Sequence, residues 1–143
     1  PCFRQKNLKF VPKRRFVIKY MRNIKDSEGN YMIIDFKNMK TEVLHNFKGG
    51  ESDTLARMFT DDNNRIMFGK LQPGASIGLH RHEGSSEIIF IQEGKGKVLF
   101  EGKDEHVEKG DVHYCPEGCR HSLINDSDDD LIYFAVVPQH RFM

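Results

Sequence analysis

Two histidines and a glutamate occur close together in one short stretch of the sequence and could bind a metal ion. His80 and His82 are one residue apart, and Glu87 follows five residues after His82. Because side chains alternate between the two faces of a strand, both imidazoles would lie on one face if this stretch is extended. Neutral imidazole and carboxylate groups suit Mn, Fe, Ni, Cu or Zn. A pair of surface histidines beside a solvated glutamate is the alternative at this point.

Short apolar runs separated by turn residues surround this stretch and indicate how it is held. Turn signals recur about every 8–12 residues, among them "DDNN" at 61–64 and "QPGA" at 72–75. This spacing, without a sustained helical period, predicts an all-β sandwich or barrel. The length of 143 residues fits one domain.

Three segments before the histidines carry more specific expectations. Residues 31–36 and 42–47 are expected to form short strands. The segment 51–59 has a helical alternative to a strand, because Ser52 or Asp53 could cap a helix there.

The segment that begins at Glu87 is apolar on both of its faces. Glu87 would share one face with Ile89 and Ile91, whereas Ile88 and Phe90 would face away. Both faces must then be covered, one by the barrel interior and the other by more protein. Since the sequence offers no long amphipathic helix for that purpose, the pattern predicts a homodimer. The alternative is that the segment around residues 31–36 covers this face within the chain.

The histidine stretch belongs to the first of two spaced motifs that together resemble the cupin family. Fifteen residues separate the motifs, and every defined position of both is matched. The first motif reads Gly74-x5-His80-x-His82-x4-Glu87-x6-Gly94, and the second reads Gly110-x5-Pro116-x-Gly118-x2-His121-x3-Asn125.

The resemblance implies a fold and a site. The expected fold is a single-domain cupin-type jelly-roll β-barrel of the all-β class. The implied metal ligands are His80, His82, Glu87 and His121. They would hold one divalent transition metal (Mn, Fe, Ni or Zn) and leave one or two coordination positions open.

The sequence leaves the catalytic residues and the substrate open. His113 and Tyr114 are candidates only, because one of them could line the cavity on the strand before His121. We also expect Ile89, Ile91 and Leu123 to line the cavity in part, which favours a partly apolar substrate such as an aromatic compound or a small acid. Ile77 and Leu79 are expected on the face opposite to the histidines.

A metal-dependent enzyme acting on a small molecule is the preferred function, of dioxygenase, isomerase or lyase type. The alternative is a non-catalytic cupin that binds or senses a sugar or another metabolite. A structural protein that uses the metal only for stability is a third reading. Fold alone does not decide among them.

The charge distribution divides the chain into two parts. Residues 1–25 carry nine Lys/Arg and no acid, whereas residues 26–143 carry 13 bases and 21 acids, a net charge of −8. We therefore expect a basic N-terminal arm over 1–25 and the cupin domain over 26–143. Met21 is a plausible start, so residues 1–20 carry no functional inference, and no nucleic-acid partner is expected.

The remaining composition bears on location. No stretch is apolar enough to span a membrane, and no sustained apolar leader is found. The three cysteines, Cys2, Cys115 and Cys119, have no framework spacing and are expected to be reduced thiols. These features predict a cytoplasmic protein without a membrane partner.

Overall fold

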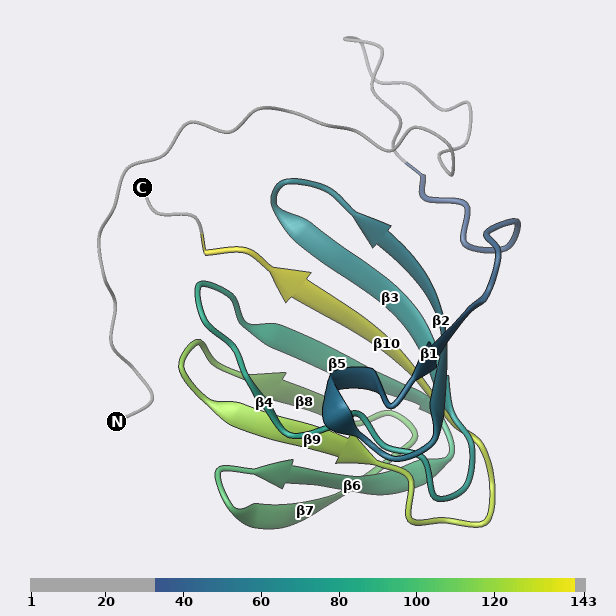
Figure 1. The fold of residues 1–143 in the computed structure, drawn as a ribbon, viewed down its shortest axis with the longest axis vertical. Helices are drawn as coiled ribbons and strands as arrows, with labels where there is room; N and C mark the ends of the chain where they lie inside the picture. Colours follow the sequence, from purple (N-terminus) through teal and green to yellow (C-terminus); the bar gives the residue numbers. More distant parts are fainter. Residues whose placement is uncertain (1–32, 141–143) are drawn as a thin grey trace, which may run out of the picture.

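The computed structural model describes residues 33–140, which form two antiparallel β-sheets (Figure 1). One sheet has six strands in the order β1-β2-β3-β10-β5-β8, and the other has four in the order β4-β9-β6-β7. The strands are β1 (Glu42–His45), β2 (Asp53–Thr60), β3 (Asn64–Leu71), β4 (His80–Arg81), β5 (Glu87–Glu93), β6 (Lys95–Phe100), β7 (Lys103–Glu108), β8 (Val112–Cys115), β9 (Arg120–Ile124) and β10 (Leu131–Pro138), and one 3₁₀ turn, η2, spans Phe47–Gly49.

The chain passes repeatedly from one sheet to the other after β3. Strand β4 belongs to the four-stranded sheet, β5 to the six-stranded sheet, the β6–β7 hairpin to the four-stranded sheet again, and β8, β9 and β10 continue the alternation. This arrangement confirms the expected all-β jelly-roll fold of the cupin type. The two sheets are not joined into one closed ladder of strands.

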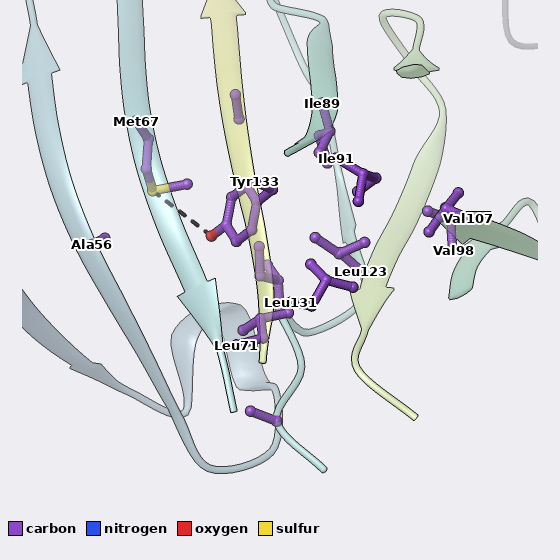
Figure 2. Packing of buried hydrophobic residues seen from close by; sticks show 13 residues of the cluster. Ala56, Met67, Leu71, Ile89, Ile91, Val98, Val107, Leu123, Leu131 and Tyr133 are labelled. Carbon is purple, nitrogen blue, oxygen red and sulfur yellow. Dashed lines mark hydrogen bonds between the residues drawn. The ribbon is translucent and has the colours of Figure 1, made fainter. Parts of the chain in front are cut away.

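The core lies between the two sheets and is built from the inward positions of their strands. On β5, Ile89 and Ile91 are buried while Ile88 and Phe90 are exposed, as alternation predicted. Leu123 of β9 faces them from the opposite sheet (Figure 2). Each such fully buried aliphatic side chain contributes roughly 1.5–3 kcal/mol to the free energy of unfolding.

Tyr133 on β10 is the largest fully buried side chain and requires a glycine opposite it. A Cβ atom on Gly69 of the neighbouring strand β3 would lie 2.1 Å from the Tyr133 ring. The Tyr133 hydroxyl approaches Met67 Sδ at 4.0 Å (Figure 2). The glycine in β3 is therefore a packing requirement and not a break in the strand.

Two expectations about the early segments are wrong. Residues 33–36 form no strand, and Phe36 instead packs edge-on against Phe68 with ring centroids 5.1 Å apart; residues 31 and 32 lie outside the described range. The helical alternative for 51–59 also fails, because β2 pairs with β3 over seven register positions. Pairing along β3 outweighs the local capping signal there.

Two other expectations from the sequence hold in a modified form. The 42–47 strand ends at His45, because Asn46 adopts a left-handed backbone with φ of 46°. The 61–64 turn joins β2 and β3, and Asp61 Oδ1 accepts hydrogen bonds from the backbone N–H groups of Asn63 and Asn64 at 2.8 and 2.7 Å. Such a bonded aspartate is a common way to close a hairpin.

Within residues 33–140, no helix is long and apolar enough to cross a membrane. The basic arm at 1–25 falls outside the described residues, so the division of the chain at residue 25 stays a prediction.

Candidate metal centre

Four side chains from three strands and one loop meet between the sheets. His80 belongs to β4, His82 follows directly after it, Glu87 begins β5 and His121 lies on β9. One nitrogen or oxygen atom of each lies within 4.8 Å of the others. Because β4 pairs with β9, His80 stands directly opposite His121 in the ladder. Strand pairing thus brings together residues about forty positions apart.

The carboxylate of Glu87 lies at the centre of the histidines. Its Oε2 atom is 2.8 Å from His121 Nε2, 3.0 Å from His82 Nε2 and 3.7 Å from His80 Nε2. Burial disfavours the charged form of Glu87, but the three histidine side chains close to it, His121, His80 and His82, outweigh this effect and hold the pKa of this carboxyl well below its usual value. Glu87 is therefore ionised at neutral pH.

The other ring nitrogens are held by groups outside the cluster. His80 Nδ1 lies 2.7 Å from the Gly78 carbonyl oxygen, and His82 Nδ1 lies 3.2 Å from Ser85 Oγ. A carbonyl oxygen only accepts, so His80 Nδ1 carries the proton and its Nε2 keeps a lone pair. Contacts of this kind fix the tautomer and orientation of metal-binding histidines.

This donor set fits a divalent transition metal. His82, Glu87 and His121 are buried, and the His80 side chain is only 18% exposed. The Nε2 atoms of His82 and His121 lie 3.0 Å apart. Nitrogen lone pairs and an ionised carboxylate that converge in a buried space are unfavourable unless a cation lies among them. Imidazole and carboxylate donors suit Mn, Fe, Ni or Zn.

The structure places the two catalytic candidates on opposite faces of β8. His113 is buried, whereas Tyr114 is 53% exposed. His113 Nε2 lies 3.0 Å from His121 Nδ1, and the two rings are stacked. Burial, reinforced by the charged form of His121, lowers the pKa of His113 to about 4, so its neutral ring can accept the His121 N–H. His113 therefore orients a cluster histidine, and Tyr114 has no contact with the cluster.

A cavity of about 270 Å³ opens beside the cluster. Neither His113 nor Tyr114 lines it, and neither do Ile89, Ile91 and Leu123, which are buried in the core. The prediction that Ile89, Ile91 and Leu123 line the cavity is therefore wrong. The cavity is lined by Phe47, Lys48, Arg65, Met67, Ile77, His80, Arg81, His82, Glu83, Ser85, Glu87, Val137 and Gln139.

Ile77 shows why the face assignment failed before the histidines. It was expected opposite to His80, yet both residues line the cavity. Residues 77–79 have no regular strand structure, so the alternation does not extend back through Gly78. Leu79, in contrast, is 50% exposed, as expected.

Sequence reasoning missed three cationic residues of the cavity, Lys48, Arg65 and Arg81. Arg65 could have been found from alternation on β3, because Met67 and Leu71 occupy the same face and are both buried. Lys48 lies in the η2 turn, whose position over the cavity has no signal in the sequence.

The cysteines only partly match the expectation of reduced thiols. Cys115 is free and buried, and burial raises the pKa of its thiol to about 12, which makes it unreactive. Cys119 is also buried, but it is disulfide-bonded, which contradicts the expectation for this residue.

Comparison with known proteins agrees with the fold. A family model described as the cupin domain matches residues 67–137. An oxalate-binding protein of Thermotoga maritima is 34% identical over 116 residues, which are 77% of this chain and 96% of that protein. The fold and the sequence together show that the chain belongs to the cupin family.

Solved structures extend the likeness. The crystal structure of a predicted oxalate decarboxylase from Thermotoga maritima is 32% identical, with a TM-score of 0.71, over 76% of this chain and 99% of that one. The polyketide cyclase RemF from Streptomyces resistomycificus, at 20% identity and a TM-score of 0.64 over 76% of this chain and 80% of that one, shares the fold alone. A germin-like protein of Morus alba is 35% identical over 70 residues, 46% of this chain and 34% of that relative, so the chain spans about a third of it.

Proposed function

We propose that this cupin binds one divalent transition metal through His80, His82, Glu87 and His121 and uses it to bind a small carboxylic acid, with oxalate as the first candidate. The observation that carries the proposal is the convergence of three histidines on an ionised, buried carboxylate at the wall of a cavity. When bound, the metal supplies a Lewis acid for a carboxylate oxygen of the ligand.

The charges of the cavity support an anionic ligand. Three cations line it, Lys48, Arg65 and Arg81, against two carboxylates, Glu83 and Glu87. A divalent metal at the cluster would raise the net positive charge further, so an anion is the complementary ligand. The similarity to an oxalate-binding protein, which spans nearly all of that relative, supports the same class.

The proposed reaction is of lyase type, with cleavage of the bond between the two carbons of a small dicarboxylate. The similarity to a predicted oxalate decarboxylase supports this choice over a dioxygenase or an isomerase. Such a reaction needs a proton donor for the new C–H bond. Glu83 lines the cavity and is its one carboxyl outside the cluster, so it is the residue that we assign to this step.

A non-catalytic binding protein is the second candidate function. It is favoured by the position of His113 and Tyr114, since neither lines the cavity where a general base would act. In that case the same metal and the same cations would hold the acid without converting it.

We further propose a homodimer that forms through the outer face of the six-stranded sheet. Phe134, Phe90 and Val112 lie in register across β10, β5 and β8, beside Phe68, which Phe36 covers within the chain. Phe90 is 39% exposed and Val112 is 61% exposed. A continuous apolar face of this kind is typical of an interface between protein chains. Cytoplasmic location stays a prediction.

The experiment begins with elemental analysis of protein purified without added metal. Metal-loaded protein is then titrated with oxalate in a calorimeter and incubated with oxalate while formate and CO₂ are measured. Metal at about one ion per chain with oxalate binding supports the proposal, and turnover separates the enzyme from the binding protein. Absence of metal binding after loading with Mn, Fe, Ni and Zn would contradict it.

A further inference from the structure

Arg65 occupies an inward position at the start of β3. Met67 and Leu71 share its face and are buried in the core, so the Arg65 side chain lies on the same side of the sheet and lines the cavity. Its neighbour across the ladder, Val137 of β10, lines the cavity as well. Within residues 33–140, no carboxylate forms an ion pair with Arg65, although guanidinium groups on the inner side of a fold are usually paired.

Lys48 reaches the same cavity from a separate element, the η2 turn. Lys48 adopts a left-handed backbone with φ of 56°, and so do Asn46 and Ser52 at 46° and 57°. Non-glycine residues in this conformation are uncommon, and such strain gathers at functional sites. The described part of the chain contains no carboxylate paired with Lys48 either.

The η2 turn is held close to the segment that leads to His80. The Gly78 N–H donates to the Phe47 carbonyl at 2.9 Å. A Cβ atom on Gly78 would lie 2.1 Å from the Lys48 carbonyl oxygen, so only glycine permits this approach. This contact fixes the backbone of Lys48 relative to His80, the first histidine of the cluster.

Arg81 differs from these two cations although it also lines the cavity. Its side chain donates a hydrogen bond to the Gly118 carbonyl, whereas Lys48, which is exposed as Arg81 is, has its Nζ 5.7 Å from the centroid of the Phe47 ring. Arg81 therefore has a structural hydrogen-bond partner, whereas no carboxylate among residues 33–140 neutralises the charges that Arg65 and Lys48 present to the cavity.

We propose that Arg65 and Lys48 form a second anion-binding point that selects small dicarboxylates over monocarboxylates. The inference rests on the proposed function: one carboxylate of the ligand would lie at the metal centre, and the other would be bound by these two cations. A guanidinium group matches a carboxylate in shape and charge. A monocarboxylate at the metal would leave both cations unpaired, and a dicarboxylate satisfies them.

The test compares dicarboxylate and monocarboxylate binding in matched variants. Arg65→Gln removes one charge from the inner face of β3, and Lys70→Gln removes one from the outer face of the same strand, where Lys70 pairs with Asp130 at 3.0 Å. Lys48→Asn removes the charge of the second residue in the proposed anion-binding point. Asparagine is chosen because it tolerates the positive φ at this position. Metal-loaded forms are titrated calorimetrically with oxalate and with acetate at one ionic strength, and their metal content is measured.

We expect Arg65→Gln to weaken oxalate binding by about tenfold or more, because a charge-assisted pair is lost, and acetate binding by less than about twofold. Lys48→Asn should weaken oxalate binding alone, and Lys70→Gln should change neither affinity. Arg65→Lys, which keeps the charge and the fold, should give an intermediate loss for oxalate. All variants should keep the metal content of the wild type.

Three results would overturn the inference. Unchanged oxalate affinity in Arg65→Gln, with tight binding in the wild type, would remove the second binding point and leave the proposed function intact. Equal losses for oxalate and acetate would make Arg65 a general source of positive potential and not a selecting residue. A metal-loaded wild type that binds neither acid would reject the proposed acid-binding function, and the inference with it.

Discussion

Replacing His113 by phenylalanine should weaken metal binding although His113 is not one of the proposed ligands. His113 Nε2 lies 3.0 Å from His121 Nδ1, and His121 is 1% exposed, so no water can replace the lost acceptor. A phenyl ring preserves the stacking on His121 and the edge contact with Phe100 at 5.6 Å. The variant therefore removes one hydrogen bond and little else.

The expected loss of metal affinity depends on what happens to the His121 N–H once its hydrogen-bond acceptor is removed. Left without an acceptor in a buried position, it costs about 1–3 kcal/mol, which corresponds to a loss of roughly 5- to 150-fold in affinity. If His121 changes tautomer instead, its Nε2 carries the proton and no longer offers a lone pair to the metal. Both routes lower the affinity, in line with the roughly 10- to 100-fold effect of outer hydrogen bonds at metal sites.

The assay is a competition between the protein and a chromophoric chelator for Zn²⁺ or Mn²⁺. Tyr114→Phe is the matched control, since Tyr114 is the exposed neighbour on the other face of β8, and it should leave the affinity unchanged. His113→Gln offers an amide oxygen as acceptor and should recover part of the loss. An affinity in His113→Phe equal to that of the wild type would refute the role assigned to His113.

Three further outcomes are expected. His80→Ala should lower metal affinity by more than about tenfold while the metal-free barrel stays folded, as measured by metal titration and thermal unfolding; retained tight binding would place the metal elsewhere. Burial lowers the pKa of His113 to about 4 and also lowers the pKa of His121, so the unfolded chain gains protons first as pH falls below about 6.5. The metal-free protein should then lose stability from about pH 6.5 to 4 in urea unfolding, and a constant stability over that range would contradict these shifts. Phe90→Glu should convert a dimer into monomers in sedimentation equilibrium at micromolar concentration, and a wild type with the mass of one chain would reject the dimer.

The four cluster residues could be predicted from the sequence because their spacing in the two motifs matches the way that the strands carrying them come together. His80 and His82 are two residues apart on one chain segment, and Glu87 follows after a short turn. Their convergence with His121 depends on the pairing of β4 with β9, which the second motif implies and which no local pattern shows. Alternation on β5 was equally predictable, because buried and exposed residues alternate from Glu87 to Gln92, up to the register shift against β10.

The failures fall where regular structure ends. Ile77 was assigned to the wrong side because residues 77–79 are not a strand, so alternation has no meaning there. Residues 33–36 resemble a strand in composition, but Phe36 is used to cover the Phe68 ring. Local propensity is overruled in both segments by contacts with residues far away in the sequence.

The chemistry of the cavity was the least predictable part, since two of its three cations come from outside the two motifs. The motifs supply the four cluster residues, and Arg65 and Lys48 come from β3 and η2, which precede both of them. Two chains could therefore hold the same metal and differ in their ligands through these two elements alone. Substitutions at Arg65 and Lys48 should change which acid binds without changing whether metal binds, and substitutions in the motifs should do the reverse. This separation follows from the way the jelly roll assembles one site from strands that are distant in the chain.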